Sequence, residues 1–273
     1  MTRVRTVAAN GVLALATAAF VFPIYWLVSS ALKPASQLWA SPPIFWPTQW
    51  IGHALATIAH DGLWVNFLHS AIASLGSTVI VLVLGTMAAY SLTRYPWRFG
   101  QGIASWVVSM KIMPPISVVL PLYLLLSGLR LYDTLPGLVL VYVLFNLPLA
   151  IWLLVGFFSQ IPRALDESAW IDGATPWQTL LRIVGPLAAP SIAGVGAVSV
   201  MLAWNDFIFA VSLTSNHAAT LPVVTVGFLG DFIWQWSSFY TAVVLEVLPM
   251  LVMAVFMQRY LVAGLSLGAF SGS

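Results

Sequence analysis

The chain contains no cysteine and very few charged residues. Its 273 residues include 10 Lys and Arg and 8 Asp and Glu, so only 7% of the chain is charged, whereas an ordinary soluble domain carries roughly 25%. The lack of cysteine excludes disulfides and thiolate chemistry. The net charge of +2 gives no support to nucleic-acid binding, because that function needs a concentrated basic surface.

Two motifs that would indicate catalysis or a resident metal are also missing. A phosphate-binding P-loop needs Gly-Lys before Ser or Thr, and neither Lys33 nor Lys111, the two lysines of the chain, follows a glycine. We therefore expect a protein that is not an enzyme, does not itself hydrolyse ATP and binds no cofactor or metal. The four histidines lack the paired spacing of zinc ligands. We expect them to be interfacial or solvated: His53, His60, His69 and His217.

Apolar residues dominate the rest of the chain. They make up 60% of it, the mean hydropathy is +0.96, and the apolar runs reach about 20 residues, enough for a helix to cross a hydrocarbon core of roughly 30 Å. Strands of a membrane barrel would alternate and run to about 10 residues. We therefore predict an all-α, polytopic membrane protein in contact with lipid. Six transmembrane helices are expected, at 8–31, 66–92, 103–127, 135–158, 187–212 and 239–261.

The basic residues divide unevenly between the two sides of these helices. Lys33 and Arg130 lie on one side and Lys111 lies inside a span. The other side holds the remaining seven: Arg3, Arg5, Arg94, Arg98, Arg163, Arg182 and Arg259. Because basic residues are enriched in cytoplasmic loops, we expect both termini to be cytoplasmic. The first apolar run is longer than the core of a signal peptide, and no clear cleavage site follows it, so we expect an uncleaved helix.

A polar insert at 161–190 interrupts the apolar pattern on the expected cytoplasmic side. Three of the eight acidic residues fall within its first half: Asp166, Glu167 and Asp172. Pro162 suits the first turn of a helix, and acidic residues near that end complement its positive dipole. Gly173 then offers a stop, since glycine readily takes the left-handed conformation that ends many helices.

The second half of the insert predicts a second short helix. Thr175 can cap it, Pro176 takes the first helical position, and Gln178 can reach back to the cap in a capping box. Gly185-Pro186 is expected to close this helix. The insert is thus predicted to be a pair of short helices, too polar to cross lipid and too well capped to be an irregular loop.

The insert resembles the EAA loop of binding-protein-dependent ABC import permeases. That loop usually reads Glu-Ala-Ala, two residues, Asp-Gly-Ala, eight residues, Ile, any residue, Leu-Pro. This chain has Glu167-Ser168-Ala169, then Asp172-Gly173-Ala174 and, after eight residues, Ile183-Val184-Gly185-Pro186. Ser168 replaces an alanine and Gly185 replaces the leucine, and neither departure removes the turn.

The resemblance extends over nearly the whole chain. The six expected spans, a proline-rich first outer loop, Trp204-Asn205-Asp206-Phe207 and Gln258-Arg259-Tyr260 look like the second, smaller permease of carbohydrate importers, the maltose MalG type. The resemblance implies one transmembrane permease domain, 1–273, in a prokaryotic cytoplasmic membrane. It would form half of the pathway of an ATP-driven importer for a sugar or sugar-like polar solute.

The resemblance also implies partners and coupling residues. The partners would be a second homologous permease, two ATPase subunits that carry the ATP and Mg²⁺, and an external solute-binding protein or lipoprotein. The EAA loop would supply a helix that sits in a cleft of an ATPase subunit. The implied ATPase-coupling residues are Glu167, Ser168, Ala169, Asp172, Gly173 and Ala174.

Polar residues inside the expected spans are costly in lipid and are therefore candidates for function. Lys111, Asp206 and Glu246 are interpreted first as structural partners of one another or of the second permease. A solute pathway would instead use amides that bind hydroxyl groups and aromatic rings that stack on a sugar. The candidates for that pathway are Tyr142, Asn146, Trp204 and Asn205.

Two other functional classes remain open at this stage. A secondary, ion-coupled transporter would use Lys111, Asp206 and Glu246 as a proton or ion relay. A scaffold subunit would have no pathway of its own. The EAA-like insert favours the importer over both, because neither alternative needs a cytoplasmic docking helix.

Overall fold

The fold is helical throughout the part of the chain that the structure describes. The computed structural model describes residues 2–47, 52–95, 102, 106–107, 109–230 and 236–269, and every regular element in these ranges is a helix. Five of those helical stretches are long and apolar enough to cross a membrane: Ala9–Ala31, Leu63–Arg94, Leu135–Phe158, Pro176–Trp204 and Trp236–Val255. The prediction of an all-α, multi-pass membrane protein is confirmed.

The chain divides into two compact units, which α4 (Leu63–Arg94) connects along the chain. Unit 1 consists of Met1–Phe67 and Leu221–Pro249, and unit 2 of Leu68–Thr220 and Met250–Ser273. Unit 1 contains α1 (Thr2–Ala31), α2 (Ala35–Leu38), α3 (Gly52–His60), α12 (Leu221–Gly230) and the part of α13 (Trp236–Ala269) that ends at Pro249. The single permease domain at 1–273 stays a prediction.

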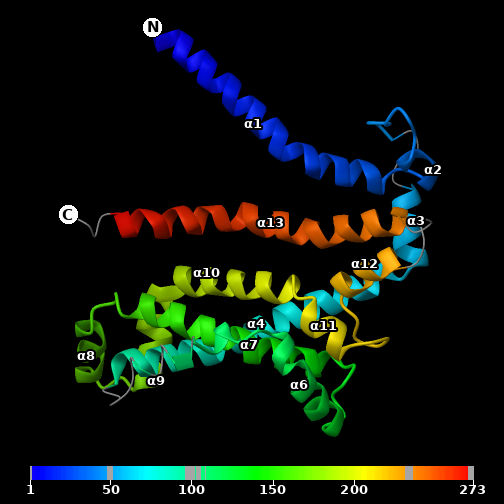
Figure 1. Cartoon of the computed structure of the whole chain (residues 1–273). Helices are drawn as coiled ribbons and strands as arrows, with labels where there is room; N and C mark the ends of the chain where they lie inside the picture. The colour runs from blue at the N-terminus through cyan, green and yellow to red at the C-terminus, as the bar shows by residue number, and fades with distance from the viewer. Residues whose placement is uncertain are drawn as a thin grey trace. The chain divides into compact units, whose positions relative to one another are not determined.

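Unit 2 contains most of α4, the end of α13 and a set of further elements, of which Figure 1 labels the α-helices. They are the turn η1 (Met110–Ile112), α6 (Ile116–Gly128), α7 (Leu135–Phe158), α8 (Ala164–Ile171), α9 (Pro176–Thr179), the π-helical turn η2 (Leu180–Val184), α10 (Gly185–Trp204) and α11 (Ile208–Leu213).

In unit 1, the end of α1 is covered by the segment that follows α2. The Tyr25 hydroxyl donates a 2.5 Å hydrogen bond, and the Ser29 hydroxyl a 2.9 Å bond, to the carbonyl of Phe45. Lys33 is almost fully buried here, with its ammonium 4.4 Å from the centre of the Trp26 ring. Burial lowers the pKa of Lys33. Residues 33–45 of the connection after the first span are therefore packed against the end of α1.

In unit 2, three long helices pack side by side. Residues of α4, α7 and α10 share one apolar core, with Val81, Leu154 and Val195 among its buried members. Gly85 allows α4 to approach α7 closely, because a Cβ at this position would lie 3.5 Å from Leu154 and 3.6 Å from Ala150. The short helices α8 and α9 lie at one end of this bundle, and α6 and α11 lie toward the other (Figure 1).

Two expected spans are interrupted rather than continuous. In the third, at 103–127, η1 ends at Ile112 and the next residue, Met113, is extended. α6 begins only after Pro114-Pro115. Proline removes backbone donors and crowds the preceding turn, so a proline pair separates the two helices. Residues 103–105 and 108 lie outside the described part of the chain. In the fifth, at 187–212, residues 205–207 separate α10 from α11.

One carboxylate joins the connection between α6 and α7 to the segment that follows α11. Asp133, with φ of 55°, accepts hydrogen bonds of 2.7–3.2 Å from the backbone N–H groups of residues 215–218. Its own N–H donates to Leu213 at 3.1 Å. Burial acts to raise the pKa of Asp133, but the backbone donors outweigh it, and the pKa lies below its usual value of 3.8.

Candidate coupling site

The insert folds into two short helices, α8 and α9, with a turn at Gly173. Gly173 has φ of +82°. Its N–H donates a 3.1 Å hydrogen bond to the carbonyl of Trp170, and the N–H of Ala174 donates a 2.9 Å hydrogen bond to the carbonyl of Ala169. These two bonds form a Schellman motif, which satisfies carbonyls that would otherwise be orphaned at the end of α8. The predicted helix stop at Gly173 is confirmed in its geometry.

The start of α9 has the predicted capping box. The Thr175 hydroxyl accepts a 3.3 Å bond from the N–H of Gln178, and the Gln178 side chain accepts a 2.9 Å bond from the N–H of Thr175. Pro176 occupies the first helical position. Because both ends of the turn are satisfied locally, the angle between α8 and α9 is set by the residues of the insert itself.

The expectation that Gly185-Pro186 closes the second helix is wrong. α9 continues through η2 into α10, so helical structure runs without a stop from Pro176 to Trp204. In η2 the N–H of Gly185 bonds to Leu180, five residues earlier. This wider turn tolerates Pro186, which lacks an N–H and would crowd a regular helix. A Cβ at position 185 would lie 2.7 Å from the Leu180 oxygen, which explains a glycine here.

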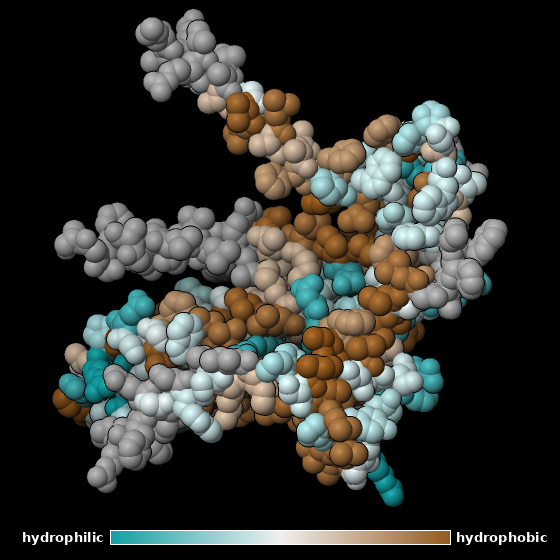
Figure 2. All heavy atoms as spheres, in the orientation of Figure 1, coloured by the Kyte–Doolittle hydropathy of each residue, from teal (hydrophilic) through white to brown (hydrophobic). Residues whose placement is uncertain are grey.

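The residues expected to couple to an ATPase divide between two faces. Glu167, Ser168, Asp172 and Gly173 are exposed, whereas Ala169 is buried and Ala174 is half-buried. The exposed surface also includes two large apolar side chains, Ile171 at 87% and Trp177 at 52%. Figure 2 shows hydrophilic residues gathered over α8 at this end of unit 2, while the surface over α6 and α11 is mainly hydrophobic.

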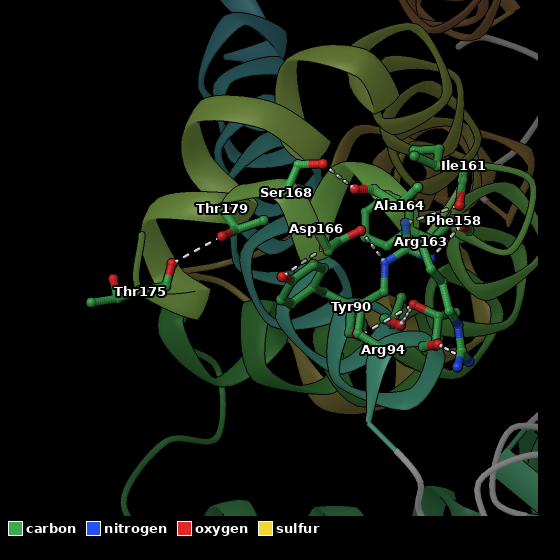
Figure 3. A network of polar contacts seen from close by, with 12 residues as sticks. Tyr90, Arg94, Phe158, Ile161, Arg163, Ala164, Asp166, Ser168, Thr175 and Thr179 are labelled. Carbon is green, nitrogen blue, oxygen red and sulfur yellow. Dashed lines mark hydrogen bonds and ion pairs between the residues drawn. The ribbon is translucent and has the colours of Figure 1, made fainter. Parts of the chain in front are cut away.

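A buried polar network holds α8 against the end of α4 (Figure 3). Arg94 Nε lies 2.9 Å from Asp166 Oδ2, and both side chains are at most 2% exposed. The Tyr90 hydroxyl donates a 3.0 Å bond to the other oxygen of the carboxylate. Asp166 thus contacts two residues of α4 one turn apart, on the face of α8 opposite to the exposed one.

The same arginine also reaches the end of α7. Arg94 donates hydrogen bonds to the carbonyls of Phe158 at 3.3 Å and Ile161 at 3.1 Å. Arg163, just before α8, donates a 2.7 Å bond to the carbonyl of Thr93. We call Tyr90, Arg94, Asp166 and the carbonyls of Phe158 and Ile161 the α4–α8 joint. It brings together the ends of three helices.

Sequence reasoning missed the joint, although one signal for it exists. Asp166 and Ala169 are three residues apart and share a helix face, and this face is buried, whereas Glu167 projects elsewhere. The sequence offers no means of choosing Arg94 as the partner, since the two residues belong to segments far apart in the chain.

Comparison with known proteins identifies the family. Residues 81–267 match the family described as binding-protein-dependent transport system inner membrane component. The chain belongs to this family. Its role as the membrane permease subunit of an ABC importer, expected from the EAA-like insert, is therefore confirmed.

Several curated relatives are similar over most of their length. The chain is 36% identical to a trehalose transport system permease of Mycobacterium tuberculosis, over 92% of this chain and 93% of the relative. It is 30% identical to a sulfoquinovosyl glycerol transport system permease of Agrobacterium fabrum, over 92% and 89%. It is 36% identical to a trehalose/maltose transport system permease of Thermococcus litoralis, over 71% of each chain.

The fold has also been seen in a solved structure. A chain of a bacterial ABC transporter involved in the import of the acidic polysaccharide alginate superposes with a TM-score of 0.76, covering 94% of this chain and 96% of that one. The sequences are 20% identical, so this likeness supports the fold of the permease and not its solute.

The proposed pathway residues of the permease lie on α7 and at the end of α10. Tyr142 and Asn146 are buried one turn apart on α7, and Trp204 is buried at the last residue of α10. Asn205 is exposed, and its side-chain amide donates hydrogen bonds to the carbonyl of Met201 at 2.8 Å and to the sulfur of Met250 at 3.4 Å. Contact between the rings of Phe145 and Phe209, 4.3 Å apart, brings α7 against α11. A role in solute binding stays a prediction for these residues.

The intramembrane charges do not form the expected mutual pairs within the described residues. Asp206 Oδ2 accepts bonds from the N–H groups of Phe209 at 3.2 Å and Ala210 at 3.1 Å, and so caps α11. Glu246 on α13 is hydrogen-bonded to Thr225 on α12. The permease therefore uses Asp206 to start a short helix after the break in its fifth span.

Proposed function

We infer that this permease imports a sugar or sugar-like polar solute. Three observations support the proposal: the relatives named for trehalose, for sulfoquinovosyl glycerol and for trehalose/maltose, the EAA-like insert, and the buried Tyr142 and Asn146 on α7. Aromatic and amide side chains suit a solute that has hydroxyl groups and apolar ring faces. The ion-coupled alternative finds no support in the contacts of Asp206 and Glu246.

The exposed helix pair α8–α9 is the observation that carries the coupling role. In the proposal it docks in a cleft of an ATPase subunit, with Ile171 and Trp177 as apolar anchors and Glu167 and Asp172 as charged contacts. Exposed apolar side chains that are surrounded by polar residues and grouped in a patch mark an interaction site. The Schellman turn sets the angle between α8 and α9, so the helix pair presents one docking surface.

In an importer of this kind the permease works with several other subunits. A second, homologous permease completes the pathway, an external solute-binding protein or lipoprotein delivers the solute, and two ATPase subunits hold ATP and Mg²⁺. This chain hydrolyses no ATP.

Both termini and the α8–α9 pair face the cytoplasm of a prokaryotic cell. A cysteine introduced at position 175 should therefore resist labelling by an impermeant external reagent in intact cells.

The variant Gly173→Val tests the coupling role. A β-branched residue is strained at φ of +82°, so the turn must change and α8 is directed away from its cleft. We expect normal insertion and normal binding of the second permease, but loss of solute uptake and of ATPase stimulation by loaded binding protein. Gly156→Val is the matched control, since open space surrounds that position on α7 and its φ is not positive. Normal uptake with normal ATP consumption in Gly173→Val would overturn the coupling role.

A further inference from the structure

We propose that the α4–α8 joint makes α8 and the ends of α4 and α7 move as one rigid body during transport. The inference rests on the proposed coupling role of α8–α9 and adds the route by which motion leaves the helix pair. Tyr90, Arg94 and Asp166 are positioning residues in this scheme, because their buried side chains contact one another and the end of α7. The route leads from the exposed face of α8, through its buried face, to two spans of the permease core.

Chain connectivity alone would allow α8 to pivot. α8 is attached to α7 through residues 159–163 and to α9 through the turn at Gly173. Neither connection fixes the tilt of α8 against α4, which is distant in sequence. Figure 3 shows Asp166 directed from α8 toward Tyr90 and Arg94. These side-chain contacts therefore restrain a motion that the backbone leaves free.

The joint resists separation because its charges are buried. At most 2% of either the Arg94 or the Asp166 side chain is exposed, and separating opposite charges in such surroundings leaves each without water to solvate it. The guanidinium also bonds the carbonyls of Phe158 and Ile161. A displacement of α8 away from α4 would break these contacts together, whereas moving the three helix ends as a unit breaks none.

Two further contacts between α8 and the end of α4 flank the joint, one before Asp166 and one after it. The Trp170 ring of α8 stacks near Tyr95, which follows α4, with ring centres 6.5 Å apart. Arg163 bonds the carbonyl of Thr93. The end of α4 thus holds α8 at three places: at Arg163 just before α8, at Asp166 in its first turn, and at Trp170 near its last residue. Three separated contacts prevent rotation as well as translation.

The first test uses distances within the wild-type permease. The chain has no cysteine, so cysteines introduced at Met87 near the end of α4 and Ala164 on α8, both exposed, can carry a pair of spin labels. The complex is assembled with cysteine-free partner subunits. We expect the same label distance in the nucleotide-free state and in the ATP-bound state trapped with vanadate. A distance that changes between the two states would overturn the proposal.

The second test breaks the joint and measures coupling. Asp166→Asn keeps the shape of the side chain but leaves the Arg94 charge uncompensated. In proteoliposomes with partner permease, ATPases and loaded binding protein, we expect uptake per ATP hydrolysed to fall about fivefold or more, the lower end of ordinary coupling between sites. The label distance should now differ between the two nucleotide states. Gln160→Ala is the control, because this exposed side chain lies outside the joint.

Milder variants serve where Asp166→Asn does not assemble. Arg94→Lys keeps the charge but cannot reach the carboxylate and both carbonyls, so we expect a smaller loss of coupling. Tyr90→Phe removes one hydrogen bond and should cause the smallest loss. Unchanged uptake per ATP in every variant that assembles would overturn the joint as a transmission element. If Gly173→Val still abolished uptake in the same membranes, the coupling role of α8–α9 would stand and only the rigid joint would be rejected.

Discussion

Two aspartates hold the two ends of unit 2 by different means. Asp166, at the α8 end, is buried and paired with one guanidinium and one phenol, both from α4. Asp133, at the α6 and α11 end, is partly exposed and accepts bonds from four consecutive backbone N–H groups. The first is a contact between side chains on separate helices. The second organises a turn of backbone.

The difference affects how each end responds to mutation. A buried charge with a single charged partner depends fully on that partner, because no water can replace it. Backbone donors at a partly exposed turn can instead bind water when the carboxylate is lost. We therefore expect the α8 end to be the more sensitive of the two, although it lies beneath the exposed coupling surface.

The largest effect on stability should follow from breaking the buried pair. We expect Asp166→Ala to destabilise the folded permease by about 3–5 kcal/mol, the usual cost of leaving one buried charge unpaired. Replacing both partners, in Arg94→Met with Asp166→Leu, should recover much of this loss, since an apolar pair of similar volume needs no solvation. Thermal unfolding of the purified permease measures both. Equal losses in the single and double variants would contradict the assignment of this pair.

Removing the other carboxylate should have a smaller effect. We expect Asp133→Ala to cost about 1 kcal/mol, as for the loss of a helix cap, because water can reach the freed N–H groups. Thermal unfolding again measures the change, and hydrogen exchange at residues 215–218 should rise. A loss as large as that of Asp166→Ala would show that the two ends do not differ in the proposed way.

The smallest effect should be a pH dependence confined to Asp133. Its pKa lies below 3.8 in the folded protein, so the carboxylate contributes stability above the unfolded pKa, and this contribution disappears as the pH falls through the folded pKa. The difference in unfolding temperature between wild type and Asp133→Asn should be constant at neutral pH and shrink below about pH 3.8. A difference that persists fully at lower pH would contradict the lowered pKa.

Much of the coupling site could be predicted because its geometry is local. The positive φ of Gly173 and the capping box of Thr175 and Gln178 depend on residues within one turn of each other, and both were expected from the sequence. Long apolar runs likewise predict the helical membrane fold, since the cost of unpaired backbone groups in lipid leaves few alternatives.

Breaks in the spans were harder to predict. Pro114-Pro115 and Pro186 are both preceded by apolar or small residues, yet the first pair separates two helices and the second proline lies inside a continuous one. Before Pro186 the backbone widens into a π-helical turn at Leu180–Val184, which leaves room for the proline. Leu180 and Val184 of this turn are buried in the core of unit 2, so the turn belongs to a packed part of the helix and is not visible in the local sequence.

The sequence by itself determined the membrane class, the helix pair and the family, because hydrophobic length, capping and motif spacing act over short stretches of chain. Only the tertiary structure decided which acidic residue of the insert points inward and what it meets. Asp166 and Tyr90 are 76 residues apart, and neighbouring Glu167 carries the same charge. The angle between successive side chains on α8 buries one and exposes the other once the helix packs on α4, because only one face of a helix can contact its neighbour.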